Sequence, residues 1–200
     1  MTPSLVLASA SPRRRELLAQ LGLDFEVMPS DVPERPRPSE TADEFAARIA
    51  REKALHVAAQ RRHQWVLAAD TVVVVDGELL GKPCDRDDAR RMLRLLSGRT
   101  HRVLTAVTLL APGGASAGDV VIETKVRFRR VRDQEIEAYL NTDEPFDKAG
   151  AYAVQGRAAE FVAAIEGSYT NVVGLPLDEV AELCRRHGVL AAMPRVGTST

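Results

Sequence analysis

A dense group of polar residues follows the first apolar segment of the chain and reads Ser9-Ala10-Ser11-Pro12-Arg13-Arg14-Arg15-Glu16. Ser11 is a suitable N-cap and Pro12 a suitable first residue of a helix. Three arginines in the first turn are unfavourable, since each cation near the positive N-terminus of a helix costs roughly 0.3–1 kcal/mol. A bound anion makes the same arrangement favourable, because backbone N–H groups, serine hydroxyls and arginine side chains together form a phosphate site. The alternative is that the long arginines extend into solvent.

A single carboxylate, Asp70, interrupts an apolar and β-branched stretch over residues 65–75. Burial of a carboxylate is costly unless the group is paired or bound to a cation, and Asp is depleted in strands. At a strand end near a phosphate site, this group could hold a metal or activate a water. A strand-end Asp that caps a neighbouring helix or pairs with an arginine explains the pattern equally well.

Lysine is rare in this chain, so the position of each lysine is informative. Lys and Arg total 27, and the lysines among them are Lys53, Lys82, Lys125 and Lys148. Lysine supplies a compact point charge where arginine supplies a rigid fork. Lys82 stands between a glycine and a proline, a context that suits a charge with a fixed reach. A solvated surface charge remains the alternative for each lysine taken alone.

Carboxylates are the metal-ligand candidates of this sequence. Asp31 and Glu34 lie in the proline-rich stretch 29–39, and Asp70 is the third candidate. Ligands that offer oxygen alone suit Mg²⁺ or Mn²⁺ held partly through substrate phosphates. The four histidines show no zinc or catalytic spacing, and no Walker A, G-x-G-x-x-G or G-x-S-x-G motif is present. Small residues over 147–156 allow a close approach of the backbone to a ligand or to another segment.

The elements that must position these residues alternate between strands and helices. The pattern predicts strands over 4–8, 25–28, 65–75, 78–80, 101–111 and 119–130, with a tight turn at Asp76-Gly77 and a loop over 112–118. It predicts helices over 12–21, 41–60, 85–96, 133–139 and 177–187, the second with a capping box of Thr41 and Glu44. Because the last two long strands form an antiparallel pair, the expected class is α/β with a mixed twisted sheet and flanking helices.

Composition excludes several classes of protein. The chain has 200 residues, of which 45% are hydrophobic, and a formal net charge of −1. This size predicts one domain over residues 1–190 and a loose tail over 191–200. A balanced charge argues against a nucleic-acid partner. No apolar run has the length of a membrane span, and the N-terminal residues lack the order of a signal peptide. Two distant cysteines indicate a reducing compartment. We therefore expect a cytoplasmic protein without a membrane partner.

Seven motifs in this order resemble those of the Maf family of nucleoside triphosphate pyrophosphatases. They are Leu7 to Leu18, Arg51-Glu52-Lys53-Ala54, Ala69-Asp70-Thr71-Val72, Gly81-Lys82-Pro83, Leu96-Ser97-Gly98, Asp147 to Tyr152, and Val173-Gly174-Leu175-Pro176-Leu177. The resemblance covers roughly residues 4–190. It implies two lobes around a deep cleft, similar to the inosine-triphosphate pyrophosphatases, and a homodimer. It also implies hydrolysis of a nucleoside triphosphate to the monophosphate and pyrophosphate with a divalent cation, Mg²⁺ or Mn²⁺.

The resemblance also assigns roles to particular residues. It implies that Asp70 is the proton acceptor. The residues on the metal and phosphate side are Ser9, Arg14, Glu34, Lys53 and Lys82. Among them Glu34, together with Asp70, is implied as a metal ligand, and Lys53 and Lys82 are implied as catalytic groups. The base-selecting positions fall on Arg13, Thr71 and Gln155, and resemble the subgroup that acts on dTTP and UTP in the house-cleaning of nucleotide pools, modified pyrimidine nucleotides included. Pro33 departs from the family, which often has an acid just before Glu34. Asp31 is a candidate substitute.

Two alternatives stay open at the level of sequence. One is another base specificity, such as N7-methyl-GTP, against which Thr71 and Gln155 argue. The other is a nucleotide-binding regulator of septum formation, a role with which the family is also associated. A regulator needs the arginine turn and the lysines but not Asp70, so the sequence favours the enzyme.

Overall fold

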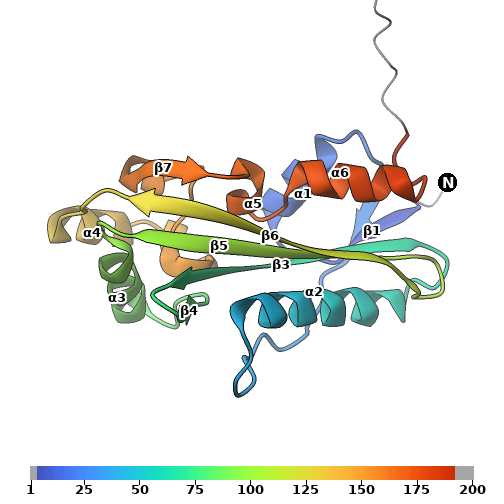
Figure 1. Ribbon diagram of the computed structural model, residues 1–200, viewed down its shortest axis with the longest axis horizontal. Helices are drawn as coiled ribbons and strands as arrows, with labels where there is room; N and C mark the ends of the chain where they lie inside the picture. The colour runs from blue at the N-terminus through green and yellow to red at the C-terminus, as the bar shows by residue number, and fades with distance from the viewer. Residues whose placement is uncertain (1–3, 192–200) are drawn as a thin grey trace, which may run out of the picture.

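The computed structural model describes residues 4–191, which fold around one mixed sheet (Figure 1). In the described part of the chain the sheet has seven strands in the order β2-β1-β3-β5-β6-β7, with β4 paired to β3. The strands are β1 (Leu5–Leu7), β2 (Phe25–Val27), β3 (Trp65–Val75), β4 (Glu78–Leu80), β5 (Thr100–Leu110), β6 (Ser116–Phe128) and β7 (Val162–Glu166). The predicted class, α/β with a mixed sheet, is confirmed.

Six α-helices and three short 3₁₀ helices surround the sheet in these residues. They are α1 (Pro12–Ala19), α2 (Ala42–Ala58), α3 (Arg86–Leu96), α4 (Asp133–Leu140), η1 (Glu144–Asp147), η2 (Ala149–Ala151), η3 (Arg157–Phe161), α5 (Tyr169–Val173) and α6 (Leu177–Arg186). The capping box of Thr41 and Glu44 opens α2 as predicted. None of the helices in the described range has the length and apolarity needed to cross a bilayer.

The central strand β3 has one edge that is only partly paired. Its other edge pairs with β5 from Val66 to Val74. On the partly paired edge, the parallel strand β1 occupies 65–67 and the antiparallel strand β4 occupies 73–75. Residues 68–72 therefore have no neighbouring strand on that side among the described residues. We call this stretch the open edge of β3.

The two faces of β3 are covered by different helices. Val72 and Val74 pack with apolar residues of α2 on one face. Leu67 and Ala69 pack on the other face with residues from α1 and α6, and Figure 1 shows α2 on the opposite side of the sheet from these two helices. Because side chains alternate along a strand, Asp70 belongs to the α2 face and Thr71 to the opposite one.

Several expectations differ from the structure. Asp70 lies in the middle of β3, where the sequence suggested a strand end; it can still be reached because β1 stops after Leu7. Strand β6 begins at Ser116, inside the predicted loop, since it pairs with β5 up to Leu110. The sequence pattern did not predict β7, α5 or the 3₁₀ helices, which are short and lack periodicity. The expected tail over 191–200 lies, except for Ala191, outside the described residues.

Candidate active site

A cleft with a volume of about 690 Å³ opens beside the open edge of β3. All of the residues to which the resemblance assigns a role line it, although they come from distant parts of the sequence: Ser9, Arg13, Arg14, Glu34, Lys53, Asp70, Thr71, Lys82 and Gln155. Asp31 is exposed and does not line the cleft. The structure therefore does not bring Asp31 in as a second acid beside Glu34.

The turn between β1 and α1 crosses the end of the open edge. Ala8 N donates to Leu67 O at 2.8 Å, which continues the pairing one residue past β1. The hydroxyl of Ser9 then accepts a hydrogen bond from Ser11 N at 3.1 Å, and Ser11 caps α1 by accepting from Arg14 N at 3.5 Å. The first turn of α1 and its two preceding serines thus face the cleft, as the phosphate-site hypothesis requires.

Arg14 is held in place by three acceptors. Its Nε donates to Gly174 O at 2.8 Å, Nη2 donates to Thr71 Oγ1 at 2.9 Å, and Nη1 donates to Ser9 Oγ at 3.4 Å. Burial lowers the pKa of this guanidinium, and the carboxylates of Asp70 and Glu34 oppose that effect. A fixed, half-buried cation with two nearby carboxylates is suited to neutralising a polyanion.

Lys53 joins two carboxylates inside the cleft. It stands on α2, is 7% exposed, and its Nζ lies 2.7 Å from Asp70 Oδ1 and 2.5 Å from Glu34 Oε1. Lys82 approaches the same cluster from the segment after β4, with Nζ 3.8 Å from Glu34 Oε2. The partner of Asp70 is therefore a lysine, and the alternative of an arginine pair or a helix cap, raised from the sequence, is wrong.

The two carboxylates of the cluster differ in basicity. Burial raises the pKa of Asp70, and the charges of Lys53 and Arg14 only partly offset that effect. Burial also acts to raise the pKa of Glu34, but the hydrogen bond and charge of Lys53 outweigh it, so this pKa is lowered. Asp70 is thus the better proton acceptor of the two, because a base with a raised pKa binds a proton more strongly.

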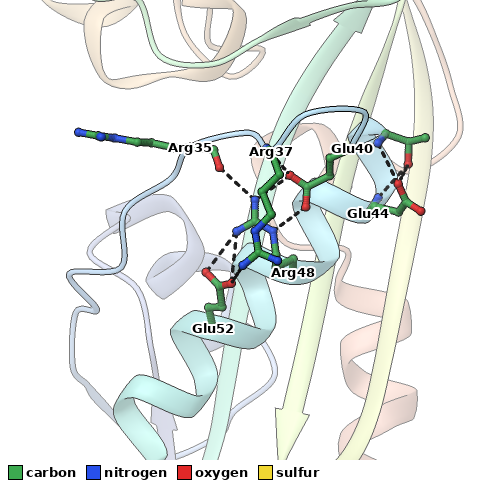
Figure 2. A network of polar contacts seen from close by, with 7 residues as sticks. Arg35, Arg37, Glu40, Glu44, Arg48 and Glu52 are labelled. Atoms are coloured by element: carbon green, nitrogen blue, oxygen red, sulfur yellow. Dashed lines mark hydrogen bonds and ion pairs between the residues drawn. The ribbon is translucent and has the colours of Figure 1, made fainter.

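A polar network attaches the loop that carries Glu34 to α2 (Figure 2). Arg48 donates to both oxygens of Glu40, at 2.5 and 2.7 Å, and to the backbone oxygen of Arg35 at 3.0 Å. Arg37 adds a contact from its Nη2 to Glu52 Oε1 at 3.1 Å. These bonds hold the proline-rich stretch on the same helix that carries Lys53. Sequence reasoning missed Arg48 and Glu40; their spacing of eight residues across a helix start was the available signal.

The turn that follows Gln155 is held by Glu144. Its carboxylate accepts hydrogen bonds from Tyr139 OH at 2.8 Å and from Arg157 N at 3.0 Å. A Cβ at Gly156 would lie 2.3 Å from these carboxylate oxygens, so a side chain at this position would have to displace the Glu144 carboxylate or shift the turn. Sequence reasoning missed Glu144 and Tyr139, since neither belongs to a motif.

The remaining charged candidates occupy the rim or the surface. Arg13 forms an ion pair of 3.4 Å with Asp147, 134 positions away in the sequence. Lys148 donates to Glu144 O at 2.7 Å. Lys125 lies 3.8 Å from Glu166, between β6 and β7, and does not line the cleft. The interpretation of Lys125 as a surface charge therefore fits the structure.

The donor set of the cleft suits a hard divalent cation only in part. Within residues 4–191, no group of three or more His, Cys, Asp or Glu side chains is arranged to hold a metal. Glu34 and Asp70 nevertheless place carboxylate oxygens around one shared cation, the Lys53 ammonium. Two carboxylates fit Mg²⁺ or Mn²⁺, which take their remaining ligands from phosphates and water.

Comparison with solved structures shows the same fold. A HAM1 protein from Coxiella burnetii superposes with a TM-score of 0.50 at 16% sequence identity, covering 91% of this chain and 98% of that protein. At this identity the likeness concerns the fold, and it agrees with the architecture expected from the sequence.

Comparison with sequences is more specific. The profile of the family described as Maf-like protein matches residues 4–187. A dTTP/UTP pyrophosphatase from Anaeromyxobacter dehalogenans is 56% identical over 190 residues, which are 94% of this chain and 96% of the relative. Another from Geobacter sulfurreducens is 53% identical over 186 residues, 93% of this chain and 97% of the relative. The chain therefore belongs to the Maf-like protein family.

Proposed function

We propose that this protein hydrolyses dTTP and UTP to the nucleoside monophosphate and pyrophosphate, and so removes these or modified pyrimidine nucleotides from the pool. The observation that carries the proposal is the cluster in which Nζ of the buried Lys53 lies within 2.7 Å of the buried Asp70 and of Glu34, inside a cleft that Arg14 also lines. The names of relatives that match almost the full chain supply the substrates.

Asp70 is the proposed base of the reaction. Formation of pyrophosphate requires that water attack the α-phosphorus, so a proton must leave that water. Burial raises the pKa of the Asp70 carboxyl, which makes it a stronger acceptor than an exposed aspartate. Its position beside Arg14 and Lys53 places the acceptor next to the groups that would hold the phosphates.

Four groups would stabilise the triphosphate. Arg14, Lys53 and Lys82 bring positive charge to the cleft, and Ser9 brings a hydroxyl at the start of the α1 turn. Such fixed charges stabilise the growing negative charge in phosphoryl transfer without having to reorganise. Glu34 and Asp70 would hold the divalent cation, which when bound supplies further charge neutralisation at the phosphate oxygens.

Three other residues that line the cleft would select the nucleobase. Gln155 carries an amide that can both donate and accept a hydrogen bond, which suits the edge of a pyrimidine base. Arg13 at the rim and Thr71 on β3 complete this set. Other base specificities, N7-methyl-GTP included, find no support among the relatives compared above.

Phosphorus NMR of the products tests the proposal. Purified protein with Mg²⁺ or Mn²⁺ is incubated separately with dTTP, UTP, CTP, GTP and N7-methyl-GTP. Pyrophosphate from dTTP and UTP, together with its loss in Asp70→Asn while nucleotide binding remains, is the expected result. Inorganic phosphate as the first product would place the cleaved bond elsewhere. Binding without any product from the wild-type protein would favour a nucleotide-binding regulator.

A further inference from the structure

A chain of side chains and one carbonyl runs from the cleft into the buried sheet. Arg14 Nη2 donates to Thr71 Oγ1 at 2.9 Å, and Thr71 Oγ1 lies 2.9 Å from Thr105 Oγ1. Thr105 Oγ1 in turn donates to the backbone oxygen of Asn171 at 3.1 Å. Thr105 and Asn171 are fully buried, and the Asn171 amide is itself fixed by Val103 O at 3.1 Å.

The chain has one possible direction. A threonine hydroxyl has one proton to donate and two lone pairs. The backbone oxygen of Asn171 can only accept, so the proton of Thr105 must point toward it; the reverse orientation would oppose two lone pairs at 3.1 Å. Thr105 must then accept from Thr71, and the single proton of Thr71 is committed to that bond.

Thr71 consequently offers the cleft a lone pair and no proton. One lone pair of its oxygen accepts from Arg14, which can only donate. The second is free to face the cleft, which Thr71 lines. Gly174, whose φ of 123° favours glycine, places no side chain beside these two groups; a Cβ there would make ordinary contact at 3.5 Å from Thr71 Oγ1 and 3.6 Å from Arg14 Nε.

The ligand group that fits this lone pair is an N–H or O–H donor. Phosphate oxygens are acceptors and do not fit. Uracil and thymine carry an imide N–H at position 3, where cytosine has a bare nitrogen that only accepts. A hydroxyl fixed as an acceptor therefore favours uracil and thymine over cytosine at this position, and a buried mismatch of two acceptors is costly.

We infer that Thr105 is a specificity-determining positioning residue: through its bond to the Asn171 carbonyl, it holds the Thr71 hydroxyl as an acceptor for the imide N–H of uracil or thymine. This inference rests on the proposed function. Thr105 does not line the cleft and acts only through Thr71. Its role is therefore distinct from that of any residue named from the family motifs.

Substrate ratios in threonine variants test the inference. In Thr105→Val the Thr71 proton is released and can turn toward the cleft, where it can pair with cytosine. We expect the ratio of kcat/KM for UTP to that for CTP to fall at least tenfold, and Thr105→Ser to restore it. Thr108→Val is the matched control: Thr108 is equally buried on β5, but its hydroxyl bonds Asp119. An unchanged ratio in Thr105→Val, or an equal fall in Thr108→Val, overturns the inference.

A nucleotide probe tests the imide contact that the inference requires, even if Thr105→Val does not fold. N3-methyl-UTP lacks the imide proton, and we expect the wild-type protein to use it at least tenfold less efficiently than UTP, while dUTP stays close to UTP. A large loss with dUTP and none with N3-methyl-UTP would show that a ribose hydroxyl meets Thr71, and would overturn the inference. Absence of any UTP hydrolysis by the wild-type protein would instead remove the proposed function.

Discussion

Asp70 and Thr71 are neighbours in the sequence, yet their side chains leave β3 on opposite faces and both line the same cleft. Asp70 meets Lys53 of α2 at 2.7 Å, and Thr71 meets Arg14 of α1 at 2.9 Å. This is possible because β1 and β4 leave the edge of β3 unpaired between them. The cleft thus receives a carboxylate from one face of the sheet and a hydroxyl from the other.

Replacement of Lys53 by methionine should lower activity and shift its pH dependence. Lys53 favours the charged form of Asp70, so its removal leaves the effect of burial less opposed and raises that pKa further. Because the base must be unprotonated, the acid limb of kcat/KM moves to higher pH, and kcat falls by about 10²-fold or more. Lys125→Met, on the sheet surface, is the control. A Lys53→Met enzyme with an unchanged acid limb would contradict the assignment of the base.

Replacement of Arg48 by alanine should loosen the loop that carries Glu34. Arg48 forms two bonds to Glu40 and one to the backbone of Arg35, and the loss of such charged bonds costs about 1–3 kcal/mol of unfolding free energy. We also expect a higher concentration of Mg²⁺ for half-maximal activity. Arg51→Ala is the control, since Arg51 is on the same helix but exposed, 4.0 Å from Asp119. Equal behaviour of the two variants would remove Arg48 from this role.

A methyl group at position 156 should disturb the turn that carries Gln155. In Gly156→Ala the new Cβ meets the Glu144 carboxylate, which is committed to the Arg157 backbone and to Tyr139 OH. The turn must shift or these bonds must break. Steady-state kinetics should show a rise of KM for UTP that is larger than the fall of kcat. An unchanged KM would mean that the turn does not position a binding group.

Acid should destabilise the protein through a buried histidine. Burial lowers the pKa of His101 to about 4, and its Nε2 lies 2.8 Å from Tyr152 OH. Between about pH 6.5 and 4, His101 is therefore protonated in the unfolded chain and neutral in the folded chain. The contribution of this group is fully present above the unfolded value and is lost as the pH falls through that window, by about 3 kcal/mol.

Urea unfolding at several pH values measures this loss. The unfolding free energy of the wild-type protein should fall more steeply from pH 6.5 to 4 than that of His101→Phe. His63→Phe, at an exposed position, should keep the wild-type slope. Parallel curves for the wild type and His101→Phe would show that His101 is not the group responsible.

The sequence predicted the larger elements because their periodicity or their end signals were strong. The apolar run of β3 and the capping box of α2 are both present where expected. Strand β7 was missed because its residues are half-exposed or exposed and its five residues form a strand by pairing with β6. The motifs located the lining of the cleft, while the roles of these residues, the homodimer and the cytoplasmic location stay predictions.

Other parts of the site depend on contacts that no local pattern reveals. Thr105 and Asn171 are connected to Thr71, which lines the cleft, through tertiary hydrogen bonds between distant segments; Thr105, for example, bonds a residue 66 positions away. The accessibility of Asp70 in the middle of β3 could not be predicted, because only the structure shows that β1 stops early enough to expose this part of the strand.

Hydrolysis of UTP in water enriched in oxygen-18 tests the central claim most directly, since the label marks the phosphorus that water attacks. Mass spectrometry of the products in the presence of Mg²⁺ should find one labelled oxygen in UMP and none in pyrophosphate. Label in pyrophosphate, or in inorganic phosphate, would contradict attack at the α-phosphorus and with it the proposed position of Asp70.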